Sequence, residues 1–137
     1  MVVLHKSRFF LFKVLKEVKC DKEEIIFNQG ESATYIYIIK SGRVKLYVGV
    51  DHTPLELIEF DVGQCFGESS LIGIQPHTAN AIVVEKTELI VLSGSALLIL
   101  YNEYIDIYTM ILLNIAREIS RRLSKVDDIL LHYVLKK

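Results

Sequence analysis

The chain lacks the features that mark membrane-spanning and secreted proteins. Its 137 residues contain no apolar run near the roughly eighteen residues that span a membrane, because Lys13, Lys16 and Glu17 interrupt the early FFLF segment. No small-residue cleavage site follows that segment, so we expect no secretory signal. The two cysteines, Cys20 and Cys65, are far apart and have no metal-ligand spacing. We therefore expect a cytoplasmic protein without membrane contact.

An excess of charge of one sign is also missing. The formal net charge is −1, whereas proteins that bind nucleic acid directly meet the phosphates with clustered Lys and Arg. The chain has no His-x-His with a trailing Glu, the ligand pattern of metal-dependent jelly-roll enzymes. Its Ser, His and Asp residues form no recognisable nucleophile arrangement. We expect no direct nucleic-acid binding, no metal and no catalysis.

Short apolar runs separated by turn residues fill the middle of the chain. Hydrophobic residues make up 51% and charged residues 24%, which predicts one folded domain over residues 1–137 rather than a disordered chain. A turn follows about every ten residues, a hairpin rhythm. This predicts a mainly β fold with flanking helices, a β-roll or jelly-roll (double-stranded β-helix) over about residues 19–93. The runs are EIIF, TYIYII, RVKLYV, PLELIEF, TANAIVV and ELIVL.

One strand of this region is irregular, and the segment before the region has a different pattern. In PLELIEF the apolar alternation changes phase between Leu57 and Ile58, which predicts a bulge or bend. Before the roll, Ser7 to Val18 reads as a short amphipathic helix or as a helix leading into a first strand, with Phe9, Phe12 and Leu15 on one side.

The period becomes helical over about residues 95–135. Ser95 or Ser93 is suited to cap a short helix from Ala96 to Tyr101, and Asp106 falls in the first turn of a much longer helix. An apolar stripe on the long helix needs a partner, and a second copy of the chain is the simplest one. We expect a homodimer through this helix, with Arg121 and Arg122 facing solvent or carboxylates of the other copy. The stripe is Leu112, Ile115, Ile119, Leu123, Val126, Leu130 and Val134.

The segment from Phe66 to Val83, FGESSLIGIQPHTANAIV, has the chemistry of a phosphate-and-sugar cradle. Gly67 permits a tight turn, after which a short helix is expected to open at Glu68, Ser69 and Ser70. The first amides of a helix are free to bind an anion. Glu68 adds an acceptor for a sugar hydroxyl, and Pro76 ends the helix before a strand-like run begins at Thr78.

This segment resembles the phosphate-binding cassette of the cyclic nucleotide-binding domains. Gly67-Glu68, Leu71, Pro76 and Thr78-Ala79 follow the family pattern Phe-Gly-Glu-x-Ala-Leu, spacer, Pro-Arg-Ala/Thr-Ala-Thr. The resemblance continues in FNQGE (27–31), in YIYIIKSGRVKLY (35–47) and in AREISRRL near the end of the chain. It implies a sensor domain like that of the bacterial catabolite regulators, with cAMP or cGMP as ligand. The implied ligand-binding residues are Phe66, Gly67, Glu68, Ser69, Ser70, His77, Thr78 and Ala79.

His77 departs from this pattern, because it stands where the family has the arginine that pairs with the cyclic phosphate. A histidine with its ordinary pKa of about 6.5 is mostly neutral at pH 7. Losing a charged hydrogen bond costs about 1.5 to 3 kcal/mol, or about ten- to a hundredfold in affinity. His77 has three readings: a weak phosphate donor, a pH-dependent switch, or a solvated residue of a pocket that no longer binds nucleotide.

The resemblance implies a non-enzymatic, dimeric sensor in which a ligand at the Gly67 to Ser70 turn biases the terminal helices. The bacterial regulators continue into a DNA-binding domain, whereas this chain stops at Lys137, so we expect either a sensor portion or a free-standing module. Hydroxyl residues that reach the base in those regulators have only Ser124 as a counterpart after Arg121-Arg122-Leu123. Two alternatives remain: the same fold with another small ligand or none, serving only to dimerise, and a cupin-like metal enzyme.

Overall fold

The computed structural model describes residues 15–50, 53–68 and 72–135. Within these residues the chain forms two antiparallel four-stranded sheets followed by two helices, α3 (Gly94–Glu103) and α4 (Ile105–Leu135). The predicted mainly β fold, a β-roll followed by a long C-terminal helix, is confirmed. The strands are β1 (Lys16–Cys20), β2 (Ile25–Phe27), β3 (Tyr35–Ser41), β4 (Val44–Val50), β5 (Thr53–Phe60), β6 (Cys65–Phe66), β7 (Asn80–Val83) and β8 (Thr87–Ser93).

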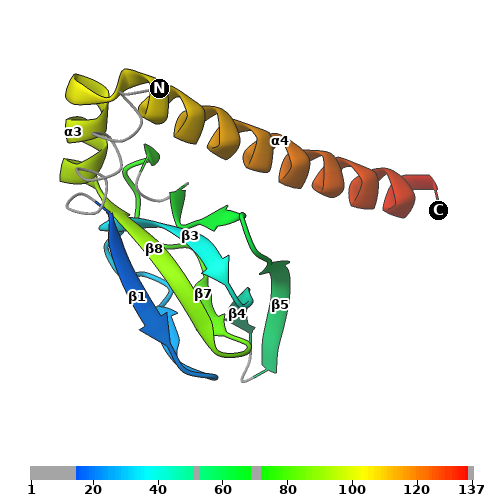
Figure 1. The fold of residues 1–137 in the computed structure, drawn as a ribbon. Coiled ribbons are helices and arrows are strands. Elements are labelled where there is room, and N and C mark those ends of the chain that lie inside the picture. Colours follow the sequence, from blue (N-terminus) through cyan, green and yellow to red (C-terminus); the bar gives the residue numbers. More distant parts are fainter. Residues whose placement is uncertain (1–14, 51–52, 69–71, 136–137) are drawn as a thin grey trace.

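The two sheets have the crossed strand order of a β-roll. One sheet runs β1-β8-β3-β6 and the other β2-β7-β4-β5. In the β4–β5 hairpin, Leu46 pairs with Ile58 and Tyr47 with Glu56, so Leu57 is an extra residue on β5. This bulge lies where the change of apolar phase predicted it. The cassette leaves the first sheet at β6 and returns to the second at β7, so it joins the two sheets at one end of the roll (Figure 1).

Two apolar clusters hold these elements together. The first lies between the sheets and contains Phe27, Tyr37, Phe60 and Phe66, whose rings have centroids 5.0 to 6.1 Å apart in the contacts they make. The second attaches the helices to the outer face of the first sheet. Its buried members are Ile36, Cys65, Leu92, Ala96, Leu100 and Ile115.

Ser93 begins α3. Its backbone is extended and its hydroxyl accepts a hydrogen bond from the Ala96 amide at 3.0 Å, so of the two serines considered, Ser93 is the cap. The helix runs from Gly94 to Glu103, slightly longer than expected at both ends. The long helix begins at Ile105 with Asp106 in its first turn, as predicted.

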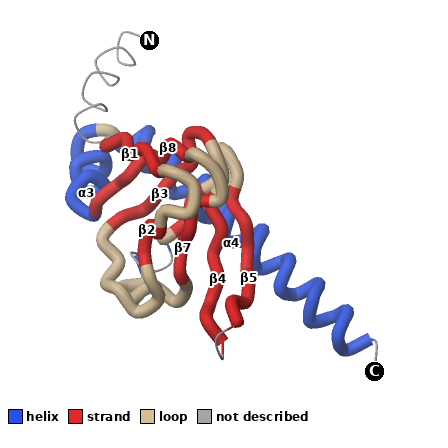
Figure 2. Tube along the Cα trace, turned by 90° about the horizontal axis from the view of Figure 1, so that it is seen from below, coloured by secondary structure: helices blue, strands red, loops and turns tan. Residues whose placement is uncertain are grey.

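Helix α4 crosses one end of the roll and continues past it (Figure 1). Figure 2 shows the same arrangement from below, with the second half of α4 extending away from the strands. Ile115 is 4% exposed and packs against the roll, so this member of the predicted stripe is already covered within the chain. The stripe that lacks a partner among the described residues therefore begins at Ile119.

Of the two N-terminal alternatives, a helix that reaches Val18 is wrong, because Lys16 to Val18 belong to strand β1 and pair with β8. The first strand of the other alternative is present. The rest of that segment, up to Val14, lies outside the described residues.

Candidate functional site

The cassette begins with a glycine that no other residue can replace without strain. Gly67 has a φ of +80°, and a Cβ built there would lie 3.1 Å from Cδ2 of Tyr37 and 3.2 Å from the carbonyl oxygen of Tyr35. The preceding Phe66 is fully buried and stacks on Tyr37, with ring centroids 5.0 Å apart. The entry to the cassette is therefore fixed by packing against β3.

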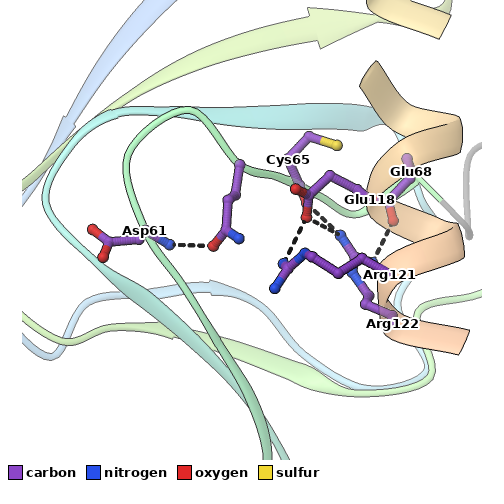
Figure 3. A network of polar contacts seen from close by, with 7 residues as sticks. Asp61, Cys65, Glu68, Glu118, Arg121 and Arg122 are labelled. Carbon is purple, nitrogen blue, oxygen red and sulfur yellow. Dashed lines mark hydrogen bonds and ion pairs between the residues drawn. The ribbon is translucent and has the colours of Figure 1, made fainter. Parts of the chain in front are cut away.

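Glu68 is fully buried, although it is a carboxylate at the head of a loop. Its Oε1 accepts a hydrogen bond of 2.5 Å from Nη1 of Arg122, which belongs to α4 (Figure 3). The other terminal nitrogen of Arg122 donates to the carbonyl oxygen of Cys65 at 2.6 Å. The guanidinium also lies 4.6 Å from the centre of the Phe60 ring. Arg122 thus connects the long helix to the cassette, to β6 and to β5.

The second oxygen of Glu68, Oε2, is buried and has no hydrogen-bond partner within residues 15–50, 53–68 and 72–135. A buried acceptor without a donor costs about 1 to 3 kcal/mol, so a group that supplies a donor there gains most of that amount. An alcohol is such a group.

Arg122 and its neighbours form one polar network on α4. Oε2 of Glu118 lies 3.0 Å from Nη2 of Arg121 and 3.8 Å from Nη2 of Arg122 (Figure 3). We expected both arginines to face solvent or a second copy. Arg121 pairs along its own helix and is 39% exposed, whereas Arg122 pairs with the buried Glu68 within the chain, so the expectation is wrong for Arg122. Sequence reasoning missed Arg122 as a site residue. The available signal was the Arg121-Arg122-Leu123 motif, which the long helix shares with the family.

His77 lies at the far end of the cassette, away from solvent. It is 4% exposed, and its ring stacks on Phe27 with centroids 3.6 Å apart and an interplanar angle of 5°. Burial lowers the pKa of His77 below its ordinary 6.5, while the nearby Glu31 acts in the opposite direction. The ring is therefore neutral at pH 7, and it is a packed residue rather than a solvated one.

Main-chain and side-chain hydrogen bonds tie this end of the cassette to the FNQGE turn. The His77 amide donates to the carbonyl of Glu31 at 2.9 Å, and the His77 carbonyl accepts from Gly30 at 2.8 Å. Asn80 adds a side-chain link, because its Oδ1 accepts from the Gln29 amide and its Nδ2 donates to the Tyr47 carbonyl. Two motifs recognised separately in the sequence therefore meet here.

The remaining predicted site residues differ in exposure, and two of them lie outside the described residues. Thr78 is exposed and Ala79 is buried at 4%. Ser69 and Ser70 lie outside the described residues, and helical backbone is present on both sides of this gap, at Glu68 and Ile72. The structure thus brings Phe66, Gly67 and Glu68 together with Arg122, whereas the ring of His77 lies on Phe27.

Metal-binding clusters and membrane-spanning helices are both missing from the described residues. No group of three or more His, Cys, Asp or Glu side chains there is arranged to hold a metal ion. No helix in that part of the chain combines the length and apolar character needed to cross a bilayer.

A β-roll with a glycine-led cradle and a long helix bonded to it defines a regulatory domain of the ligand-sensing class. The profile of the cyclic nucleotide-binding domain matches residues 17–104. The chain belongs to the cyclic nucleotide-binding domain family.

Individual relatives agree with this assignment. The cyclic AMP receptor protein of Thermus thermophilus is 32% identical over 105 residues, which cover 74% of this chain and 46% of that protein. The crystal structure of the Thermus thermophilus catabolite activator protein superposes with a TM-score of 0.74 at 25% identity, covering 94% of this chain and 59% of that one. A cyclic nucleotide-binding domain from Methylobacillus flagellatus has the same fold, with a TM-score of 0.80, 19% identity and coverage of 90% and 70%. The chain spans less than half the length of the Thermus receptor.

Proposed function

We propose that the chain is a non-enzymatic sensor that binds a cyclic nucleotide, cAMP or cGMP, at the cassette and reports occupancy through α4. The observation that carries the proposal is the fully buried carboxylate of Glu68, whose Oε2 has no partner among the described residues. A ribose hydroxyl supplies the missing donor. Gly67, with its left-handed backbone, brings this carboxylate to the head of the cassette.

The link to α4 gives the proposed sensor a route for its signal. Arg122 belongs to the long helix and donates a hydrogen bond to Oε1 of Glu68. A ligand that binds Glu68 changes the electrostatic surroundings of Arg122 and so favours some positions of α4 over others. This route needs no contact between ligand and partner protein.

We further propose that α4 forms a homodimer and that the protein works in the cytoplasm. Support for the dimer comes from the exposed apolar residues of the stripe beyond the roll, which a second copy would cover. The stripe residues concerned are Ile119, Leu123, Val126, Leu130 and Val134, between 42% and 71% exposed. Support for the location comes from Cys20 and Cys65, which are both free thiols.

Calorimetric titration with cAMP and cGMP tests nucleotide binding. We expect saturable binding that does not tighten markedly from pH 7 to pH 6, because burial lowers the pKa of His77 and so disfavours the charged ring. Markedly tighter binding near pH 6 would instead assign the phosphate to a protonated His77. Absence of both heat and thermal stabilisation at millimolar nucleotide would rule out the proposal.

Replacing His77 tests the phosphate end of the site. The variant His77→Arg restores the charged fork of the family pattern, and we expect about tenfold tighter binding or more. The matched variant His77→Gln also removes the ring from Phe27 but adds no charge, so it should not tighten binding. Equal affinities for both variants would show that residue 77 does not face the phosphate.

A second candidate is the same fold with another small ligand, or with dimerisation as its only role. The observation that favours it is the position of His77, whose ring stacks on Phe27 inside the roll. The cassette from Phe66 to Ala79 contains no Lys or Arg that could take over the phosphate. Failure of both nucleotides in the titration, together with an intact dimer, would establish this candidate.

A further inference from the structure

A cavity of about 260 Å³ lies between α4 and the outer face of the first sheet. Its apolar wall consists of four isoleucines, two from strand β3 and two from α4: Ile36, Ile38, Ile111 and Ile115. This helix–roll cavity is distinct from the cradle around Glu68, which does not line it. Ligand sites for drug-sized molecules occupy roughly 300 to 1,000 Å³, so an occupant here is smaller.

The polar rim of the helix–roll cavity carries an excess positive charge. Asn114, Arg117 and Glu118 of α4 contribute to it. The Glu118 carboxylate is already balanced by Arg121 at 3.0 Å, while Arg122, 3.8 Å away, pairs with Glu68. Arg117 has no ion pair within the part of the chain that the structure describes. An apolar chamber edged by Arg117, with which no described residue pairs, fits a small apolar molecule that ends in a carboxylate.

We propose that the helix–roll cavity binds small aromatic or alicyclic carboxylates, with the hydrocarbon part against the isoleucines and the carboxylate at Arg117. The site is separate from the stripe through which α4 is proposed to dimerise, because Ile111 and Ile115 face the roll. The existence of this site does not depend on whether the cradle binds a nucleotide.

Occupancy of the cavity has a direct route to the cradle. Glu118 lines the cavity and belongs to the network in which Arg122 holds Glu68 (Figure 3). A carboxylate ligand beside Glu118 therefore changes the position of the same helix turn that contacts the cradle. This regulatory step rests on the proposed function: ligands of the two sites influence each other's affinity reciprocally.

Methyl NMR tests the site directly, because its apolar wall is made of isoleucines. The protein is labelled at isoleucine δ1 methyls and titrated with benzoate. We expect saturable shifts at Ile36, Ile38, Ile111 and Ile115, with Ile82 and Ile129 unaffected. Shifts that are absent up to the solubility limit, or spread over all isoleucines, would overturn the proposal.

Two variants separate the apolar and charged parts of the site. Ile111→Trp fills the cavity and should abolish the benzoate shifts, whereas Leu113→Trp, on an exposed part of the same helix, should leave them unchanged. Arg117→Gln should weaken benzoate by about fivefold and leave uncharged benzamide unaffected. Equal weakening of both probes would show that Arg117 does not bind the carboxylate. The Arg117 comparison remains decisive if the tryptophan variant does not fold.

The regulatory step is tested by repeating the benzoate titration with saturating cAMP. We expect the benzoate affinity to change by about fivefold or more. An unchanged affinity in nucleotide-bound protein would remove the coupling and leave the cavity site standing. If cAMP alone shifts no methyl signal, the proposed function fails together with the coupling, while the benzoate result in free protein stands by itself.

Discussion

At the scale of single residues, Glu68 and Arg122 depend on each other. The Glu68 side chain has no exposed surface and that of Arg122 is 21% exposed, so water stabilises neither charge well. Removing one member of such a pair leaves a buried charge without compensation, which is more costly than replacing both members by apolar groups. The pair is therefore weak support for overall stability but a strong constraint on where α4 lies.

Replacement of Arg122 should reveal this dependence. We expect Arg122→Met to lower the free energy of unfolding by about 3 kcal/mol, because it leaves the buried Glu68 carboxylate without its ion-pair partner. The matched variant Arg121→Met should cost less than about 0.5 kcal/mol, since Arg121 is 39% exposed and its ion pair, with Glu118, runs along its own helix. Urea denaturation measures both. The double variant Glu68→Met/Arg122→Met should recover most of the loss, and equal losses for the two single variants would contradict the prediction.

His77 links stability to pH through its burial. Because burial lowers its pKa below the ordinary 6.5, the unfolded chain binds the proton more readily than the folded chain. The stabilisation by neutral His77 is therefore complete above pH 6.5 and is lost as the pH falls below that value.

We expect the unfolding free energy of the parent protein to decrease from about pH 7 to about pH 5, and this decrease to be smaller in His77→Phe. The phenylalanine keeps a ring against Phe27 but does not titrate. Denaturant unfolding across the pH range provides the measurement. His132→Gln serves as the control and should retain the parent's decrease, because His77 is still present. A decrease of the same size in His77→Phe would place its origin elsewhere.

At the scale of elements, the start of α3 depends on one hydroxyl. Ser93 accepts from the Ala96 amide at 3.0 Å, whereas Ser95 is an exposed residue of the first turn. We expect Ser93→Ala to lower the unfolding free energy by about 1 kcal/mol and Ser95→Ala to cause no loss, because alanine is the better helix former. Thermal unfolding of the two variants distinguishes them. A larger effect at Ser95 would contradict the assignment of the cap.

Helix α4 uses successive parts of one face for different contacts. Ile111 and Ile115 pack against the roll, and Arg122 bonds to the cradle. The stripe from Ile119 to Val134 is exposed instead. One rigid helix thus contacts both the proposed ligand site and the proposed partner copy, which is the arrangement that a signal between them requires.

At the scale of the whole molecule, the stripe on α4 determines the assembly that we propose. The double variant Ile119→Asp/Val126→Asp places charges in the middle of the stripe and should give monomers by light scattering. The matched variant Ser120→Asp/Ser124→Asp adds the same charge on the flank of the helix, with Ser124 about 140° from Ile119, and should remain dimeric. A dimer that survives the first double variant would show that the copies meet through another surface.

Much of the fold was predictable because its signals are local. Turn residues every ten positions predicted the strands, the phase change beside Leu57 predicted the bulge, and Asp106 lies in the first turn of α4 as expected. The N-terminal segment was less informative, since its apolar residues suit a helix or a strand. Pairing with β8, through contacts distant in sequence, gave Lys16 to Val18 their strand conformation.

The sequence by itself determined the β-roll and the family, because periodicity and short motifs are properties of neighbouring residues. Only the tertiary structure decided which partners the site residues have. Arg122 reaches Glu68 across 54 positions, and the ring of His77 lies on Phe27 rather than in solvent. Such pairings depend on how α4 and the two sheets pack in three dimensions, where burial changes the cost of each charge, and no local pattern records that arrangement.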